Sequence, residues 1–511
     1  MPESWWITSP ATSAAPSHLG ERVSHRQRLT LVAAILGSAV AAIDGSIVNV
    51  ALPAIERDLG GGLSAQQWVS NAYLLTLGSL ILIGGSLGDI YGERRIFTLG
   101  LAGFGVFSVA CAFAPTIEVL IAARALQGAA AALLTPASLA IIVAAFGPKE
   151  RGAAIGSWTA WGGMAAIIGP LAGGWIVDAL SWRWIFALNV PVVIATILLV
   201  LAVVPRTAPI AGRRVDVIGA GLGALGLAGI VFALIEQPHY GWSSPVIAIP
   251  LVAGVVSLAL FLAYERRTAE PMLKLDLFSR RNFAVGNLET LAMYAGIAIL
   301  FFYLTIYLQE VAGYTALESG LATVPVTIVM FTLSRRFGAL ADRYGPRLFM
   351  GAGPLIAAVG IFLLARMGMN VSYVTDMLPG LLIFAIGLTL TVAPLTATIL
   401  ADADQEDAGI ASAVNNAVAR IAGLIGVSIV GIIVAGSMVG DTFAANAESV
   451  SAFQHVMMIC AGLLGAAGVI GSLGITNPSR RVKAEECPGG QFVGAPVPAA
   501  GGHGELAAPP A

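Results

Sequence analysis

The segment GSLGDIYGERR at residues 85–95 separates two long apolar stretches, and a similar segment, GALADRYGPR, occupies residues 338–347. The offset between the two copies is constant, because Asp342 follows Asp89 by 342 − 89 = 253 positions and Gly345 follows Gly92 by the same number. A short polar turn that joins two hydrophobic helices and occurs twice indicates two halves built on one plan. Many membrane transporters are organised in this way.

The composition is that of a membrane protein. Hydrophobic residues make up 57% of the 511 positions and charged residues 11%, whereas soluble domains carry roughly 25% charged residues. The fold class that we expect is therefore an all-α polytopic membrane protein. The three cysteines offer neither a disulfide framework nor a metal-ligand spacing, and we expect no metal site.

Fourteen stretches of about 18 or more mainly apolar residues predict fourteen transmembrane helices. The first stretch is too long for the core of a signal peptide, so we interpret it as a retained helix. An even number of spans places both ends of the chain on one side of the membrane. The predicted limits are 30–52, 68–88, 96–114, 117–143, 152–177, 184–204, 217–235, 247–264, 283–307, 317–337, 348–367, 377–400, 409–436 and 453–473.

Positive charge decides the side, because Lys and Arg are retained in the cytoplasm. Nearly all of them outside the spans lie in the tails and in the loops on the side of the termini, whereas the opposite side carries Arg57, Arg183 and Arg366. We therefore expect a multi-pass protein of the cell (cytoplasmic) membrane with both termini in the cytoplasm. The acidic loop at residues 402–407 departs from this pattern.

A second pair of matching segments defines the domains. Gly152 opens the fifth stretch and Gly169 lies within it. Gly409 and Gly426 occupy the same positions in the thirteenth, with an offset of 409 − 152 = 257 and 426 − 169 = 257. The spans therefore divide into two six-helix bundles and an inserted pair, whose role we expect to be packing or lipid contact. The predicted domains are a cytoplasmic N-terminal tail (1–29), an N-terminal bundle (30–204), the inserted helices with their linkers (205–282), a C-terminal bundle (283–475) and a disordered cytoplasmic C-terminal tail (476–511).

Four charged residues lie inside the predicted spans, namely Asp44, Arg124, Glu289 and Arg420. A charge at this depth costs about 3 kcal/mol or more, so it normally faces a cavity and serves transport. Asp44 lies roughly 21 Å from the inner end of its helix and Arg124 roughly 10 Å from the outer end of its own, similar levels in a core of about 30 Å. We expect this pair to take part in proton coupling; the alternative is a purely structural salt bridge.

Glu289 and Arg420 are the other candidates for proton coupling. Glu289 lies near the inner end of its span, so the alternative for this residue is a carboxylate that reaches the inner interface. Arg420 lies deeper, beside Asn415 and Asn416, and its alternative is a buried structural ion pair. A nearby arginine favours an ionised carboxylate and an apolar cavity disfavours it, so a moving arginine or an arriving cation can switch protonation.

Two glycine-rich segments have a physical interpretation of their own. In the turn, Gly85 and Gly88 permit a close approach of helices. Asp89 can cap a helix or form an ion pair at the inner face, with Arg94 and Arg95 nearby; the alternative is a turn that serves topology alone. In the fifth span, the glycines and the proline of residues 169–174 make a bendable, tightly packed strip, for which ordinary helix packing is the alternative.

Together, these segments resemble the major facilitator superfamily, specifically its fourteen-helix drug:proton antiporters of the EmrB/QacA type. The resemblance covers nearly the whole chain between the tails. It rests on the turn at 85–95 and on DGSIVNVALP at 44–53, RALQG at 124–128, GPLAGG at 169–174 and WRWIF at 182–186; Gly45 stands where threonine is more usual.

The resemblance implies a role for each glycine-rich segment. The turn would form a cytoplasmic gate that opens when the carrier faces inward, with the residues Gly85, Gly88, Asp89, Gly92, Arg94 and, in the second copy, Asp342. The strip would be the antiporter helix motif, which seals the pathway in one conformation, with the residues Gly169, Pro170, Gly173 and Gly174.

The function expected from these patterns is a proton-coupled antiporter that exports small amphipathic or drug-like compounds by alternating access. The alternatives are an exporter of an endogenous metabolite or lipid, and a proton-coupled importer, against which the strip at 169–174 argues. A membrane enzyme or sensor is a further rival, but the sequence contains no nucleophile with partners, no phosphate loop and no metal spacing. We expect no cofactor beyond the proton gradient, a small-molecule substrate, protons and the lipid bilayer as partners, no nucleic acid, and a monomer.

Overall fold

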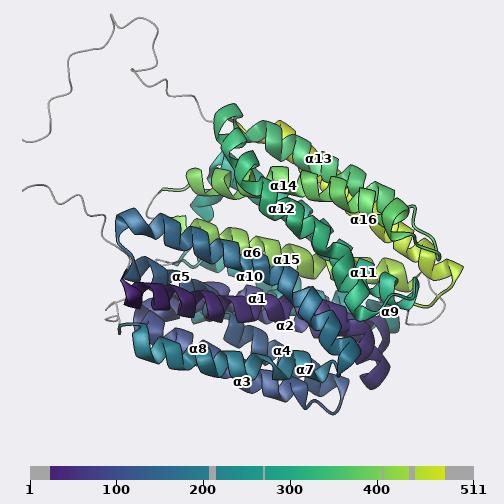
Figure 1. Cartoon of the computed structure of the whole chain (residues 1–511), viewed down its shortest axis with the longest axis horizontal. Helices are drawn as coiled ribbons and strands as arrows, with labels where there is room; N and C mark the ends of the chain where they lie inside the picture. Colours follow the sequence, from purple (N-terminus) through teal and green to yellow (C-terminus); the bar gives the residue numbers. More distant parts are fainter. Residues whose placement is uncertain (1–23, 207–214, 269–270, 405–407, 437–442, 478–511) are drawn as a thin grey trace, which may run out of the picture.

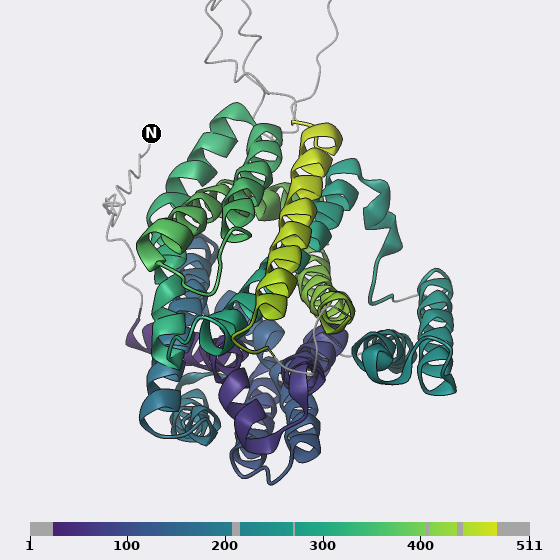
Figure 2. The same cartoon turned by 90° about the vertical axis from the view of Figure 1, so that its right-hand side faces the viewer.

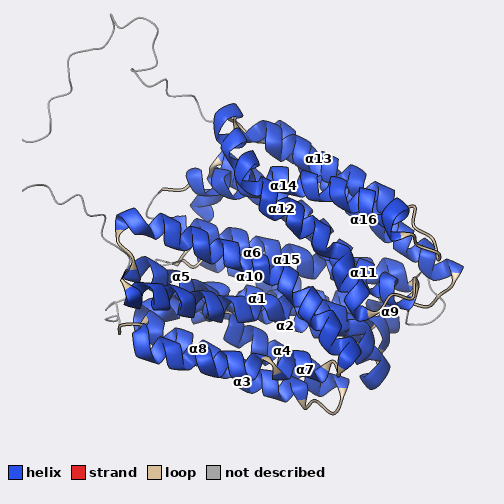
Figure 3. Cartoon of the chain, in the orientation of Figure 1, coloured by secondary structure: helices blue, strands red, loops and turns tan. Residues whose placement is uncertain are grey.

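The computed structural model describes residues 24–206, 215–268, 271–404, 408–436 and 443–477. Within these ranges the chain is helical and contains no strand (Figure 3). The prediction of an all-α fold is therefore confirmed. The two predicted tails lie almost entirely outside the described residues.

The N-terminal half consists of long helices with two interruptions (Figure 1). The fourth predicted span is divided into α4 and α5 around Ala132 and Leu133, and the sixth into α7 and α8 around Leu188. The helices are α1 (His25–Leu59), α2 (Gly62–Tyr91), α3 (Glu93–Ala112), α4 (Ile117–Ala131), α5 (Leu134–Ala145), α6 (Pro148–Ala179), α7 (Arg183–Ala187) and α8 (Asn189–Val203).

The second half follows an inserted pair of helices and, in the part of the chain that the structure describes, consists of six long helices without such interruptions, α11 to α16, with two short helical turns. The inserted pair is α9 (Val217–Tyr240) and α10 (Pro245–Glu265). The remaining helices are η1 (Leu275–Ser279), α11 (Arg281–Glu310), α12 (Ala316–Tyr344), α13 (Pro346–Leu364), η2 (Tyr373–Met377), α14 (Leu378–Ala401), α15 (Ala408–Ala435) and α16 (Ala447–Gly474).

Among the described residues, twelve helices are long and apolar enough to cross a membrane. The two segments of α2, Gly62–Ile81 and Ile83–Tyr91, are bent relative to each other and together qualify as one further span, which gives thirteen. α6, which is 32 residues long, lies where the fifth span is predicted. These helices fit fourteen spans, and the count of fourteen stays a prediction.

The first helix begins earlier than the sequence predicts. α1 starts at His25 rather than at Thr30, because Ser24 and Gln27 form a capping box in which each side chain accepts a hydrogen bond from the other's backbone N–H. Gln27 also donates to the Ala145 carbonyl at 3.0 Å. Residues 24–29, assigned to the tail from their polarity, thus belong to the bundle.

The two copies of the turn have the same backbone geometry. Gly92 separates α2 from α3 with φ = 87°, and Gly345 separates α12 from α13 with φ = 91°. This left-handed region is accessible to glycine and strained for most other residues. The repeat recognised in the sequence therefore reflects two equivalent sharp turns.

The inserted pair lies at the edge of the molecule (Figure 2). α9 packs against α2 and α15, whereas α10 packs mainly against α9. α9 extends beyond the predicted end at Ile235 and includes Glu236, whose carboxylate accepts a hydrogen bond from the Trp68 indole at 2.7 Å. Glu236 thus lies within α9, one residue beyond the predicted end of the span.

The acidic inner loop is held by arginine. Arg280 donates to the Asp402 carbonyl at 2.6 Å and forms an ion pair with Asp404, which keeps the pKa of the Asp404 carboxyl below its usual range. The Asp402 carboxylate accepts a hydrogen bond from the Phe283 N–H at 3.0 Å. Asp402 and Asp404, the acids of this loop that the structure describes, thus have partners at the inner end of α11.

The two halves contact each other near the end opposite to the start of α1 and the end of α16. Gln309 of α11 donates to the Val50 carbonyl of α1 at 2.9 Å. Gln67 of α2 donates to the Val427 carbonyl of α15 at 2.8 Å. All the hydrogen bonds between the halves that the structure describes lie toward this end, which the charge pattern assigns to the outer face.

Candidate functional site

An ion pair is buried in the middle of the N-terminal half. Asp44 lies in α1 and Arg124 in α4, and their side chains are 0% and 1% exposed. Nη1 of Arg124 donates a hydrogen bond to Oδ2 of Asp44. The structure thus brings together the two residues that helix depth predicts to lie at one level.

Three further polar side chains form a hydrogen-bond network around the ion pair. Oδ1 of Asp44 accepts hydrogen bonds from Gln127 at 3.1 Å and from Asn189 at 2.9 Å. Gln127 accepts from Arg124 at 2.7 Å and donates to Ser108 at 2.8 Å. Both carboxylate oxygens therefore have donors, and the charge is stabilised as buried charges require.

Arg124 also faces the aromatic ring of Tyr73. The guanidinium carbon lies 4.2 Å from the ring centroid, and Nε donates to the Val69 carbonyl at 3.2 Å. A desolvated cation over an aromatic face gains roughly 2 kcal/mol. The phenol of Tyr73 donates to the Ala41 carbonyl at 3.0 Å, so the ring is fixed between α1 and α4.

Arg420 lies against α2, the helix of Tyr73, from the other half. It belongs to α15, and its side chain begins beside Gly78 of α2. Its Nε is buried without a hydrogen-bond partner, and no salt bridge of Arg420 is seen in the described part of the chain. Arg124 and Arg420 thus contact α2 from the two halves.

Glu289 is isolated from these residues. It lies in α11, is 0% exposed, and faces Gly471 of α16. Neither of its carboxyl oxygens has a hydrogen-bond partner in the described residues. The side chain therefore does not reach the inner interface, and it does not share the site of Asp44.

The glycine strip of α6 packs against both halves. Gly169 and Gly173 face Ser46 and Ile47 of α1, where an added Cβ would collide with their side chains. On the other side, Gly174 faces the backbone of Leu317 at the start of α12. Close approach of this kind needs residues without side chains.

Two further contacts reinforce the junction of α6 with α12. Pro170 lies against Gly320 of α12. The Asp178 carboxylate accepts hydrogen bonds from the N–H groups of Ala316 and Leu317 at 3.1 and 2.8 Å, which caps α12. The strip is thus part of the contact that closes the outer end.

The turn residues lie at the opposite end. Gly88 is buried at the end of α2, Gly85 lies beside Pro136 of α5, and Asp89 is half-buried. Arg94 donates to the carbonyls of Val204 and Leu201 at the end of α8, at 2.9 and 2.8 Å. In the second copy, Asp342 is exposed. The turn therefore connects the inner ends of α2, α3 and α8.

Sequence reasoning missed four participants in the buried site, namely Gln127, Asn189, Ser108 and Tyr73. Gln127 belongs to the quoted segment 124–128 and Asn189 follows the segment 182–186 by three residues, and their polarity within apolar spans is a signal that was available. Ser108 and Tyr73 are residue types that occur widely in transmembrane helices. No cluster of three or more potential metal ligands occurs in the described residues.

Comparisons with known proteins agree with the fold. A profile of the Major Facilitator Superfamily matches residues 34–427. The puromycin resistance protein pur8 of Streptomyces alboniger is 36% identical over 417 residues, which cover 80% of this chain and 82% of that protein. The multidrug resistance protein Stp of Mycobacterium tuberculosis is 34% identical over 414 residues, covering 81% and 77%.

The probable actinorhodin transporter of Streptomyces coelicolor is 31% identical over 451 residues, covering 86% of this chain and 78% of that protein. Among solved structures, a D-xylose-proton symporter superposes with a TM-score of 0.62 at 15% identity, covering 88% of this chain and 98% of its own. The peptide transporter POT in complex with sulfate has a TM-score of 0.63 at 14% identity, covering 87% and 93%. At such low identity the structural likeness shows the fold alone.

Proposed function

The chain belongs to the major facilitator superfamily, and we propose that it is a proton-coupled antiporter that exports small amphipathic or drug-like compounds by alternating access. It is a multi-span membrane transporter and not an enzyme. The export of drug-like compounds is supported by relatives named for antibiotic and multidrug resistance. We further propose a monomer in the cytoplasmic membrane with both termini in the cytoplasm.

The observation that carries the coupling mechanism is the buried pair of Asp44 and Arg124. Arg124 favours the ionised carboxylate, so a proton reaches Asp44 only when the guanidinium withdraws or another cation replaces it. α2 connects this event to the other half, because Arg124 lies over Tyr73 of α2 and Arg420 of α15 lies beside Gly78 of the same helix. Movement of α15 relative to α2 would therefore shift the helix that carries Tyr73 against Arg124.

The outer contacts support an inward-facing arrangement. The strip of α6 and the cap of Asp178 on α12 join the halves at the outer end. Opening outward requires these contacts to separate, while the inner ends approach each other. We propose that the turn at 85–95 then acts as the inner gate, as alternating access by rocking of two bundles requires.

Transport in everted vesicles tests this function. Vesicles with the full-length protein should accumulate a toxic dye or antibiotic to which expression gives tolerance, and accumulation should stop when the pH gradient is dissipated. Efflux from such vesicles with the gradient would instead indicate an importer. If no compound in a broad panel shifts tolerance or accumulates, export of an endogenous metabolite or lipid becomes the better assignment.

The gate has a matched test in the two copies of the turn. Asp89→Asn should slow turnover while the substrate concentration at half-maximal rate changes little, because a gate residue acts on the conformational equilibrium. The same change at exposed Asp342 should have a smaller effect. Unchanged turnover in Asp89→Asn at equal membrane abundance would remove the gating role.

A further inference from the structure

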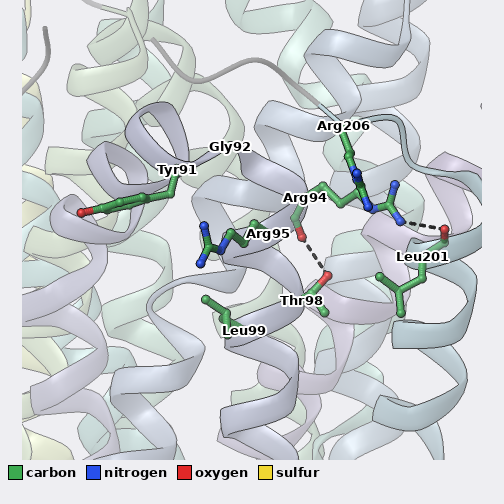
Figure 4. Close-up of a pocket in the computed structure, with 8 residues that line it drawn as sticks. All are labelled: Tyr91, Gly92, Arg94, Arg95, Thr98, Leu99, Leu201 and Arg206. Atoms are coloured by element: carbon green, nitrogen blue, oxygen red, sulfur yellow. Dashed lines mark hydrogen bonds between the residues drawn. The ribbon is translucent and has the colours of Figure 1, made fainter. Parts of the chain in front are cut away.

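A hollow of about 450 Å³ opens at the inner ends of α3 and α8, outside the buried site. Three arginines line it together with apolar side chains. Figure 4 shows the guanidinium of Arg95 on the side of Tyr91, and those of Arg94 and Arg206 beside Leu201 of α8. The hollow thus combines concentrated positive charge with an apolar floor.

The arginines differ in their hydrogen bonds. Both terminal nitrogens of Arg94 donate to backbone carbonyls at the end of α8, so this residue joins α3 to α8 and forms one side of the hollow. Arg95 and Arg206 are exposed, and within the described ranges no hydrogen bond or ion pair engages either side chain. Two guanidinium groups are therefore available to an anion that enters the hollow.

An apolar surface continues from the hollow into the membrane-facing side. Leu99 of α3 and Leu201 of α8 line the hollow and are 53% and 49% exposed. Farther along the same helices, Val106 and Leu198 are also exposed. A ligand with a charged head and an apolar tail fits both the arginine-lined hollow and the apolar surface of α3 and α8. A small soluble anion would occupy the hollow alone.

The second copy of the turn lacks these features. Arg347 corresponds to Arg94 and likewise holds a carbonyl, that of Ser472 at 2.7 Å. The position equivalent to Arg95, at 95 + 253 = 348, is Leu348. The arginine that binds a backbone carbonyl is thus present in both halves, as Arg94 and Arg347. Arg95 has no counterpart in the second half, so helix packing at the turn does not require an arginine at this position.

We propose that this hollow binds the phosphodiester headgroup of an anionic phospholipid from the inner leaflet. Arginine donates paired, charge-assisted hydrogen bonds to phosphate oxygens, and the inner leaflet supplies anionic lipid beside juxtamembrane basic residues. Arg95 and Arg206 bind the phosphate from two sides, and the acyl chains lie along Leu99 and Leu201. This site is independent of the transported substrate and of the buried ion pair.

Lipid titration of the purified full-length protein in neutral detergent tests the site. Native mass spectrometry measures retention of phosphatidylglycerol, with phosphatidylcholine of the same chain length and glycerol 3-phosphate as the other ligands. The double variant Arg95→Gln/Arg206→Gln should lower the affinity for phosphatidylglycerol roughly tenfold or more, as expected for the loss of charge-assisted hydrogen bonds. The single variants provide the same test if the double variant fails to elute as a folded species.

The control variant is Arg266→Gln/Arg267→Gln, which removes two exposed arginines at the inner end of α10. It should retain nearly all the binding, because it changes net charge equally but leaves the hollow intact. An equal loss of phosphatidylglycerol affinity in both double variants would mean that the lipid is attracted by net positive charge alone, and it would contradict a binding site in the hollow. Equal retention of phosphatidylcholine would also overturn it, and tight binding of glycerol 3-phosphate alone would assign the hollow to a soluble anion instead.

Discussion

Asp44 and Glu289 are both carboxyl side chains buried inside transmembrane helices, one in each half, yet their surroundings are opposite. Asp44 has donors from Arg124, Gln127 and Asn189. Glu289 has no partner for either oxygen within the described residues. Depth in the membrane is therefore a poor guide to the state of an acid, since the donors around it decide whether a charge is stabilised.

The contrast assigns different states to the two acids. An ionised carboxylate without partners is costly in an apolar interior, so we expect Glu289 to be neutral and Asp44 to be ionised beside Arg124. A group whose protonation follows the movement of an arginine suits coupling, whereas a permanently neutral acid contributes packing. Substitutions at these sites should therefore differ in their effects on export and stability.

Asp44→Asn should have the largest effect. It should abolish uphill export, because the amide of asparagine cannot take up and release a proton as a carboxylate does, and it should lower stability by about 3 kcal/mol, because Arg124 remains buried without its counter-ion. The double variant Asp44→Asn/Arg124→Gln should recover much of that stability without recovering export. Thermal unfolding in detergent and vesicle transport measure the two effects; recovery of export in the double variant would contradict the coupling role.

Gly174→Ala should weaken the outer contact between the halves. The added Cβ would collide with the backbone of Leu317, and such overpacking costs roughly 1–3 kcal/mol. The outward-facing population should rise, which labelling of an introduced cysteine facing the pathway would detect from outside. Gly156→Ala on the same helix, where an added Cβ meets nothing within 4 Å, is the control and should leave labelling unchanged.

Arg420→Gln should distinguish the role of Arg420, which is partly buried, from that of Arg124, which is fully buried. Arg420 has an unpartnered Nε, whereas Arg124 is paired, so loss of Arg420 should change stability by less than about 1 kcal/mol while loss of Arg124 alone costs about 3 kcal/mol. Export should fall, because α15 loses its contact with α2 through this side chain. Comparable destabilisation by the two changes would mean that Arg420 has a buried counter-ion in solution.

Glu289→Gln should have the smallest effect. A neutral carboxyl and an amide are similar in shape and polarity, so stability should change by less than about 1 kcal/mol and uphill export should persist. The same two assays apply. Loss of export with an intact fold would transfer a coupling role to this acid and reverse the comparison.

The sequence predicts a large part of this account, for reasons of physical chemistry. Composition and span length determine an all-α membrane protein, and the repeated turn is visible because Gly92 and Gly345 need a left-handed backbone that few residues adopt. Helix rise places Asp44 and Arg124 at one level because both spans cross the same slab. These inferences depend on distances along a helix axis, which the sequence contains.

The missed features depend on direction around the helix axis and on contacts between helices. The sequence does not show that Glu289 points toward α16, or that Tyr73 lies against Arg124. The start of α1 was missed because a capping box at Ser24 lies within a polar segment. Contacts of these kinds follow from packing that a single sequence does not display.

Proton release from the purified protein in weakly buffered detergent tests the central claim most directly. Addition of a transported compound to the wild-type protein should release protons, Glu289→Gln should release them equally, and Asp44→Asn should release none while still binding the compound. Undiminished release from Asp44→Asn, together with loss of release from Glu289→Gln, would contradict the assignment of coupling to the buried pair of Asp44 and Arg124.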